Sequence, residues 1–255
     1  DSLACAMLAL KEERCLRLLG PTITGTTVPN GIPVPGTDFK LDPIKATFDM
    51  GACIRWLDYN DTWLAKEWGH PSDNIAGILA VSDFVNKKNK ENNSQKNEGN
   101  DTNKKITLDY VLHSIIKAYE IQGILALDNS FNEAGLDHVV LVKVATAAMA
   151  SKILGGSFEQ TIQILSNTWL DGQSLRVYRH GENTAQRKSW AAGDAASRAV
   201  ELAWMTVFGG EPGCNTPISA KTWGVNEVFL KGKDLNTASR NSNAKIFDSY
   251  VMENI

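Results

Sequence analysis

The sequence has few cysteines, no excess of basic charge and no long apolar run. None of the four cysteines has the C-x-x-C spacing of a zinc or iron–sulfur site, and their scatter predicts reduced, mostly buried thiols. No apolar stretch approaches the roughly 18 residues of a membrane-spanning helix. The net charge of −3 comes without a basic and aromatic stripe. We therefore expect neither a membrane nor a nucleic acid among the partners.

The common catalytic motifs are also missing. No G-x-S-x-G, P-loop or H-E-x-x-H string is present, and no G-x-G-x-x-G follows an expected strand. No cluster of carboxylates and histidines has the spacing of metal ligands. If the chain is an enzyme, these absences favour an acid–base catalyst that uses no cofactor and no metal and acts on an anion.

Helical periodicity dominates what is present. Apolar residues recur at helical spacing in five long segments: 41–59, 107–123, 139–155, 157–170 and 189–208. Three of these segments begin with capping signals, which are Asp42 before Pro43, Thr107, and Ser157 with Gln160. Strand-like alternation is confined to short pieces such as 223–230. The predicted fold class is therefore mainly α, a multi-helix domain.

Several segments fall outside this pattern. Residues 21–37 are rich in proline and glycine, which predicts an irregular wrap over the helices. Residues 86–105 contain no apolar side chain, which predicts a disordered surface insertion. The opening "LACAMLAL" could be the apolar part of a signal peptide, but no basic segment precedes it and a short amphipathic helix explains it better. The start at Asp1 and the abrupt end "SYVMENI" lead us to expect a piece of a longer protein.

The stretch "WLDYNDTWLAKEWGHPSDN", residues 56–74, combines three tryptophans with several ionisable side chains, as the wall of a pocket does. Asp58, Thr62 and His70 could converge there if a helix ends near Thr62 and the chain turns back before Pro71. A histidine beside a carboxylate can act as a general acid or base near neutral pH. The alternative is structural, with Asp73 as a helix cap, Asp61 as a solvated residue and His70 as a hydrogen-bonded loop residue.

A second candidate site is the cation-rich segment 171–199. Its basic side chains could bind an anion, because arginine matches the geometry of a carboxylate; they are Arg176, Arg179, His180, Arg187, Lys188 and Arg198. A solvated basic loop is the alternative. His138 follows Asp137 just before an apolar helix, where a capping aspartate and an interfacial histidine would be an adequate explanation.

Long strings of this sequence resemble the MmgE/PrpD family. They include "GACIRWLDYNDTWLAKEWGHPSDNIAGILA", "GLDHVVLVKVATAAMASKILG", "DGQSLRVYRHGENTAQRKSWAAGDAASRAVELA" and "SYVMENI", in order along nearly the whole chain. The resemblance implies a helical MmgE/PrpD domain over residues 1–240. It also implies a smaller α+β lid domain, largely missing, that begins within 241–255. Family members are usually homodimers, in the mitochondrial matrix of eukaryotes and otherwise in the cytoplasm.

The implied activity is dehydration of 2-methylcitrate to 2-methyl-cis-aconitate in propionate catabolism, without an iron–sulfur cluster or another cofactor. The family motif falls on Asp58, Thr62 and His70, and His138 matches a second family histidine approximately. The relatives that decarboxylate cis-aconitate carry a lysine where this chain has Ser197, in "GDAASRA". This difference favours dehydration. The alternatives are a related tricarboxylate dehydratase, a decarboxylase-like enzyme, or a truncated helical module without catalytic activity.

The resemblance also suggests the roles of the candidate residues. Asp58 and His70 are the candidate acid and base, and Thr62 would hold a substrate oxygen. The substrate-binding candidates are Arg176, Arg179, His180, Arg187, Lys188, Arg198 and His138.

Overall fold

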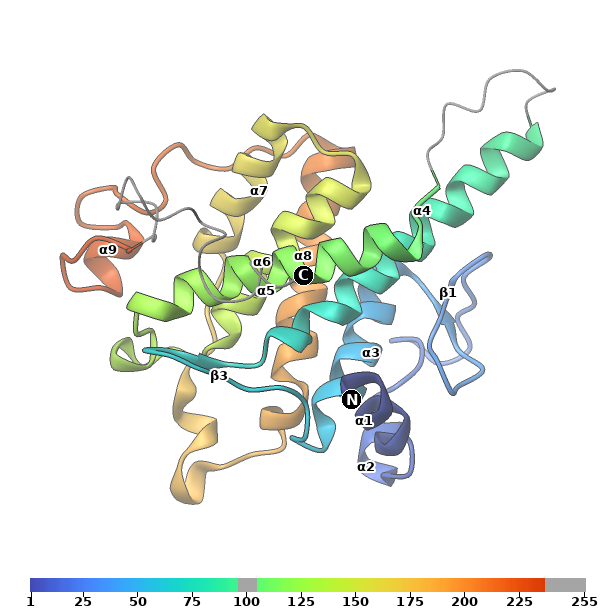
Figure 1. Ribbon diagram of the computed structural model, residues 1–255, viewed down its shortest axis with the longest axis horizontal. Helices are drawn as coiled ribbons and strands as arrows, with labels where there is room; N and C mark the ends of the chain where they lie inside the picture. The colour runs from blue at the N-terminus through green and yellow to red at the C-terminus, as the bar shows by residue number, and fades with distance from the viewer. Residues whose placement is uncertain (96–104, 237–255) are drawn as a thin grey trace.

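The computed structural model describes residues 1–95 and 105–236, and these residues form a mainly helical domain, which confirms the predicted fold class. Two long helices, α6 (Val139–Leu154) and α8 (Arg187–Gly209), pack against each other at its centre. Figure 1 shows four further helices around this pair: α3 (Pro43–Trp56), α4 (Ile75–Gln95), α5 (Leu108–Asp128) and α7 (Phe158–Leu170).

The remaining elements are short. The small helices are α1 (Ser2–Ala9), α2 (Glu13–Leu16) and α9 (Val225–Val228). Four 3₁₀ turns connect the longer elements: η1 (Pro71–Asn74), η2 (Asn132–Ala134), η3 (Arg176–Arg179) and η4 (Gly181–Asn183). The strands of the described residues form two antiparallel pairs, β1 (Ile32–Pro33) with β2 (Lys40–Leu41) and β3 (Trp63–Leu64) with β4 (Trp68–Gly69).

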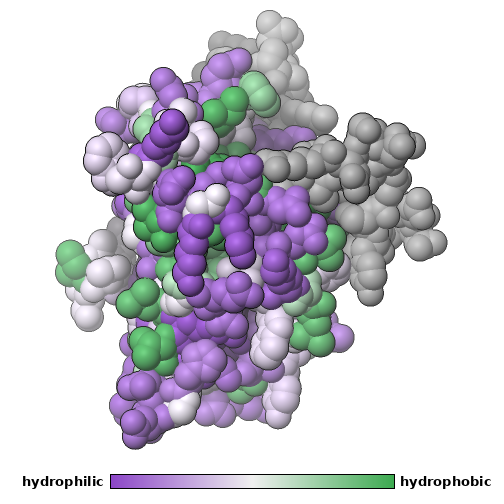
Figure 2. All heavy atoms as spheres, turned by 90° about the vertical axis from the view of Figure 1, so that its left-hand side faces the viewer, coloured by the Kyte–Doolittle hydropathy of each residue, from purple (hydrophilic) through white to green (hydrophobic). Residues whose placement is uncertain are grey.

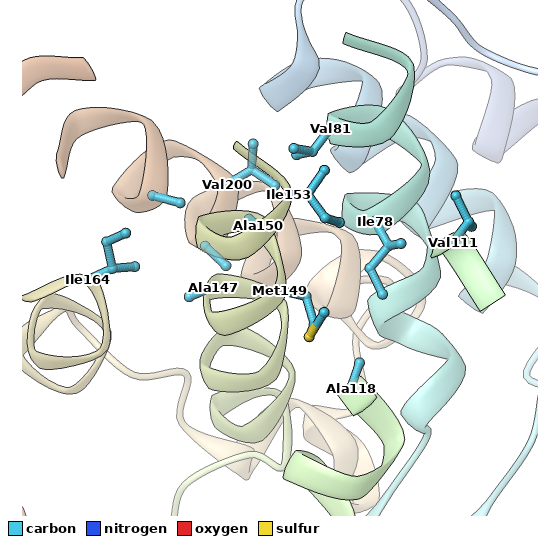
Figure 3. Close-up of a cluster of buried hydrophobic side chains, with 12 residues drawn as sticks. Ile78, Val81, Val111, Ala118, Ala147, Met149, Ala150, Ile153, Ile164 and Val200 are labelled. Atoms are coloured by element: carbon cyan, nitrogen blue, oxygen red, sulfur yellow. The ribbon is translucent and has the colours of Figure 1, made fainter. Parts of the chain in front are cut away.

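The main hydrophobic core lies around the second half of α6. Figure 3 shows Met149 and Ile153 of α6 between Ile78 of α4 and Val200 of α8. The residues of this cluster are buried, with side chains from α4, α5, α6, α7 and α8. Burial of apolar surface is the main favourable contribution to folding, so this cluster fixes the helices that carry the candidate site.

Two glycines allow α3 and α8 to approach closely. A Cβ atom on Gly51 would lie 2.7 Å from Cα of Gly193, and a Cβ on Gly193 would lie 2.7 Å from the carbonyl oxygen of Phe48. Real side chains do not tolerate contacts this short, so both positions need glycine. The close crossing brings the last turn of α3 near the first turn of α8, where the candidate site lies.

Local capping signals correctly predict three helix starts. The carboxylate of Asp42 accepts hydrogen bonds from the amides of Ile44 and Lys45, both at 2.9 Å. Thr107 accepts from the amide of Tyr110, and Ser157 forms the expected capping box with Gln160. The segment "LACAMLAL" is helical in α1, as predicted. These signals are reliable because each satisfies free backbone amides within one turn.

Two predictions of local structure are wrong. Residues 86–95 are the end of α4 rather than a disordered insertion; residues 96–104 lie outside the described part. The apolar first half of α4 is packed in the core, and a helix that is already nucleated extends easily. Lys87 also anchors it by donating to the carbonyl oxygen of Gly31 at 2.6 Å.

The alternating segment 223–230 contains the helix α9 and no strand. Its last four amides bond within the segment, as the amide of Val228 does to the carbonyl oxygen of Gly224 at 2.9 Å, and the three amides before these bond to carbonyl oxygens of residues 217–220. Residues 21–37 are irregular as predicted, apart from β1. The expected lid domain begins in 241–255, outside the described residues, and stays a prediction.

The surface seen in Figure 2 is mainly hydrophilic, with separate hydrophobic patches. Large apolar side chains that are exposed include Leu64 and Trp68 on the β3–β4 hairpin. None of the described helices combines the length and the apolar character that a membrane crossing requires.

Candidate active site

Side chains from distant parts of the sequence meet at the end of α3, the turn η1, the start of α6, the turn η3 and the start of α8. The helix α3 ends at Trp56, earlier than the expected end near Thr62, and the hairpin β3–β4 follows. The turn η1 is fixed in the core, because Asn74 donates to Gln122 of α5 and accepts from Thr146 of α6, both at 2.7 Å. This anchor holds His70, the residue before η1.

Both ring nitrogens of His70 have hydrogen-bond partners. Nδ1 lies 2.6 Å from the carbonyl oxygen of Asp61, and Nε2 lies 2.9 Å from Nη2 of Arg55. Because a carbonyl only accepts and a guanidinium only donates, the proton lies on Nδ1. Burial, with the positive charge of Arg55 and the proximity of His138, lowers the pKa of His70 to about 4. His70 is therefore neutral at pH 7, and its basic nitrogen is already occupied.

Asp58 is held between two cations. It forms ion pairs with Arg55 and, at 2.7 Å, with Lys188 of α8. Its backbone is left-handed, with φ of 60°, a conformation that aspartate adopts more readily than most residues. Burial disfavours the carboxylate, but the hydrogen bond from Lys188 and the charge of Arg55 outweigh it and lower the pKa of Asp58 to about 2. Asp58 is thus an anion at any physiological pH.

His138 lies in a different environment. Its side chain is 4% exposed, its Nδ1 lies 3.1 Å from Oδ1 of Asp137, and its Nε2 has no hydrogen-bond partner in the described part of the chain. Burial lowers the pKa of His138, although the bond to Asp137 opposes this. The imidazole is therefore neutral at pH 7, with its proton on Nδ1 and the lone pair of Nε2 free.

Asp137 is fixed by η3. Arg179 donates to both carboxylate oxygens from Nε and Nη2, at 2.7 and 2.8 Å, and the Tyr178 hydroxyl donates to one of them. Although burial opposes ionisation, the hydrogen bonds from His138 and Arg179 hold the pKa of Asp137 far below its usual range. The buried, bidentate pair gives the Asp137–His138 dyad a fixed orientation.

The two histidines are neighbours. Their ring centroids are 5.3 Å apart and the rings meet edge to face at 64°. The two hydrogen-bond networks, one around Arg55 and Asp58 and the other around Asp137 and Arg179, therefore meet at one place. We call these networks the His70 side and the His138 side of the site.

A buried carboxyl group lies in η1, three residues after His70. Asp73 of η1 has no exposed surface and accepts a hydrogen bond from Asn60 at 3.1 Å, while its Oδ2 has no partner among the described residues. Burial raises the pKa of Asp73 to about 7, although Arg55 opposes the rise. The sequence suggested only a cap here, because burial of this turn depends on tertiary packing.

Several predicted site residues lie elsewhere or on the margin. Arg198 pairs with Asp171 and Glu201 beside a cavity of about 110 Å³, and Arg187 pairs with Asp194. These contacts are with carboxylates near α8 rather than with either histidine. The remaining predicted residues sit close to the site: Thr62 is exposed, His180 accepts from Nε of Arg176 at 3.2 Å, and Arg176 lies 3.5 Å from Glu67.

Sequence reasoning missed Arg55, Asp137 and Asp73 as site residues. Arg55 follows a run of buried residues in α3, with nothing to mark it as functional except its charge. Asp137 was considered only as a cap. Across residues 1–95 and 105–236, no three histidine, cysteine or acidic side chains gather as metal ligands would.

Comparisons with known proteins identify what the chain resembles. The family model named MmgE/PrpD N-terminal domain matches residues 1–238. All 255 residues align at 51% identity with the mitochondrial 2-methylcitrate dehydratase of Yarrowia lipolytica, covering 46% of that protein. The alignment with the 2-methylcitrate dehydratase of Escherichia coli K12 gives 50% identity and covers 50% of it. The chain thus spans about half the length of these curated relatives.

Proposed function

Because the chain belongs to the MmgE/PrpD family, we propose that it is the histidine-bearing N-terminal half of a 2-methylcitrate dehydratase, a hydro-lyase. Identity of about 50% along all 255 residues supports the substrate. The observation that carries the chemistry is the free Nε2 of buried His138, held by Asp137. Elimination of water needs a base for a carbon-bound proton and an acid for the departing hydroxyl group.

We assign the base to His138. A neutral imidazole whose Nδ1 donates to a buried carboxylate can accept a proton at Nε2, and the carboxylate then stabilises the imidazolium. The proton removed lies on the carbon next to a substrate carboxylate, and the electron pair left behind forms the double bond as the hydroxyl group leaves. Asp137 cannot serve as the base itself, because Arg179 and Tyr178 occupy its oxygens.

The His70 side is better suited to binding than to proton transfer. Nε2 of His70 accepts from Arg55, and Asp58 stays ionised, so neither is a ready acid or base. This assignment departs from the acid and base roles expected for Asp58 and His70. Arg55 and Lys188 face one carboxylate, Asp58, which leaves one positive charge for an anionic substrate. A cation of this kind can hold a substrate carboxylate by charge and by hydrogen bonds. Thr62 is exposed and could hold a substrate oxygen.

Ser197 favours dehydration over decarboxylation. It stands where the cis-aconitate decarboxylases are expected to have a lysine, and it is buried in α8. Its hydroxyl donates to the carbonyl oxygen of Asp194 at 2.9 Å, so this position brings no cation to the site.

The names of the relatives support a proposal for the location of the protein in the cell. A mitochondrial location is our proposal for a eukaryotic source, in line with the name of the Yarrowia lipolytica relative, and a cytoplasmic one for other sources. The homodimer and the lid domain inferred from the resemblance to the family stay predictions.

The test joins this chain to the C-terminal half of the Yarrowia lipolytica enzyme. We expect the fusion to convert 2-methylcitrate to a conjugated product, seen as an increase in ultraviolet absorbance, without release of CO₂. The whole Yarrowia lipolytica enzyme is the positive control, and the fusion with His138→Asn is the negative one. A folded fusion that gives no conjugated product, while the whole relative does, would contradict the proposal. Release of CO₂ would identify a decarboxylase instead.

A further inference from the structure

Two cysteines that are far apart in the sequence touch in the fold. Sγ of Cys15 in α2 and Sγ of Cys53 in α3 are 3.9 Å apart, across 38 positions of sequence. Both are buried, in a small cluster with Ala9 that packs against Leu10 and Trp56. The other cysteines are not part of this cluster: Cys5 is buried elsewhere and Cys214 is exposed. The scatter of cysteines in the sequence therefore conceals one dithiol pair.

The two sulfurs lie near enough for a disulfide to form after a small movement. A disulfide bond is about 2.05 Å long, so the sulfurs would have to approach by about 1.9 Å from their separation of 3.9 Å. The helix α3 is fixed by its contact with α8, whereas α2 has four residues and its Glu13 and Arg14 are exposed. A small displacement of α2 can therefore close the distance without disturbing the core.

We propose that Cys15 and Cys53 are a redox-active dithiol that a peroxide oxidises to an intramolecular disulfide. In the first step a sulfur attacks one oxygen of hydrogen peroxide, the O–O bond breaks, and a sulfenic acid and water form. In the second step the other sulfur attacks the sulfenic sulfur, the S–S bond forms and a second water leaves. The two thiols lose two electrons and two protons in total, and the peroxide becomes two water molecules.

The two sulfurs have different roles in this reaction. Either sulfur of the pair can donate the hydrogen bond, and with Cys53 as the donor the bond lowers the pKa of Cys15 and raises that of Cys53. The thiolate is the nucleophile, so Cys15 attacks the peroxide and Cys53 resolves the sulfenic acid. Because Cys15 is buried, we expect the reaction to require local opening of the short α2, an event of low energy at the periphery of a fold.

Oxidation would act on the end of α3. Cys53 lies two residues before Arg55, so the disulfide would tie α2 to the turn that carries Arg55. The disulfide would close a loop across 38 positions of sequence, which lowers the conformational entropy of the unfolded chain. We expect the melting temperature Tm to rise by roughly 5–10 °C on oxidation, and dithiothreitol to reverse the rise.

The experiment treats the 255-residue chain with hydrogen peroxide, removes the peroxide, and alkylates the remaining thiols under denaturing conditions. We expect the thiols of Cys15 and Cys53 to be lost together and peptide mapping to find one linkage, between these two residues. Cys15→Ala and Cys53→Ala should each abolish the linkage and the rise in Tm. Cys5→Ala and Cys214→Ala are the matched controls and should keep both. Circular dichroism of the reduced variants confirms that each one folds.

Three outcomes would overturn the proposal. The first is retention of both thiols at peroxide concentrations that oxidise Cys214. The second is a linkage that involves Cys5 or Cys214. The third is conversion of Cys15 to sulfinic acid without any linkage, which would show that Cys53 cannot reach it.

Discussion

Each of the two sides of the candidate site carries a histidine, but only one of these histidines has a ring nitrogen that is free to accept a proton. On the His70 side, Nε2 accepts a hydrogen bond from Arg55. On the His138 side, Nε2 is buried and has no partner in the described part of the chain. Both imidazoles have a lowered pKa and both carry their proton on Nδ1. The difference lies in the neighbours, a cation for one and a carboxylate for the other.

This comparison shows that a lowered pKa does not identify a catalytic base. A base also needs a free lone pair and a partner that stabilises the charge it gains. Protonation of His70 would place a second cation beside Arg55, whereas protonation of His138 is stabilised by Asp137. The same residue type can therefore bind on one side and take a proton on the other.

The largest expected effect comes from exchanging each histidine for asparagine. The Asn side chain can still donate to Asp137 or to the carbonyl oxygen of Asp61, but it lacks Nε2. In the fusion with the Yarrowia lipolytica half, His138→Asn should lower kcat by about 10²–10⁴-fold, because the base is gone. His70→Asn should lower kcat less, by about 10-fold, because Arg55 loses the hydrogen-bond acceptor that positions it.

The control for this pair is the melting curve of each variant. Both variants should stay folded, so that activity per folded molecule can be compared. If His70→Asn loses as much kcat as His138→Asn or more, the roles of the two sides are reversed. Equally small losses of kcat in the two variants would show that neither histidine is the base.

The next effect concerns the carboxylate that distinguishes the His138 side. Asp137→Asn leaves Arg179 buried without its anion, and breaking a buried ion pair costs about 3–5 kcal/mol of the free energy of unfolding. Urea denaturation of the 255-residue chain measures this loss. Lys188→Met is the control on the other side, and should cost under about 1 kcal/mol because both partners of the Lys188–Asp58 pair are exposed and Asp58 keeps Arg55 as a partner. Similar losses in the two variants would contradict the comparison.

The helices were largely predictable from the sequence because their signals are local. Asp42, Thr107 and Ser157 cap their helices through amides two or three residues away. The errors arose where a segment depends on distant contacts. Residues 86–95 continue a helix that the core has nucleated, and 223–230 has no partner strand among the described residues.

The site was only partly predictable for the same reason. Asp58, His70 and Lys188 do meet, in one network through Arg55. Arg55 itself was missed, because a single arginine inside a helix has no local signature. The free Nε2 of His138 follows from packing between residues 68 positions apart in the sequence, which spacing cannot reveal.

A smaller effect appears in the pH dependence of stability. Asp73 has its pKa raised from 3.8 to about 7, so between these values the folded chain holds a proton that the unfolded chain has lost. Stability therefore falls as the pH rises through this window. His70 has its pKa lowered from 6.5 to about 4, so there the unfolded chain holds the extra proton and stability rises with pH. The two effects oppose each other in the wild-type chain.

Single substitutions should separate them. Asp73→Asn removes the contribution that lowers stability as the pH rises. The free energy of unfolding should then rise more steeply between about pH 4 and 6.5, by up to roughly 1.4 kcal/mol per pH unit. His70→Asn removes the opposite contribution, so the free energy of unfolding should rise less, or fall, with pH in the same window. Urea denaturation at several pH values measures both. A slope unchanged by Asp73→Asn would mean that this carboxyl group titrates at its ordinary pKa.

The smallest expected effect on stability is at Lys188, which is 40% exposed in its pair with Asp58. Lys188→Met should cost under about 1 kcal/mol, because exposed ion pairs contribute little and Asp58 keeps Arg55 as a partner. Its effect in the fusion should fall on binding: KM for 2-methylcitrate rises and kcat changes little, as expected for a cation that holds a substrate carboxylate equally in ground and transition states. Lys188→Arg, which keeps the positive charge, should have a KM close to that of the wild-type fusion. A fall in kcat at constant KM, not rescued by arginine, would instead make the ammonium group the acid for the departing hydroxyl, and the His70 side would then share in proton transfer.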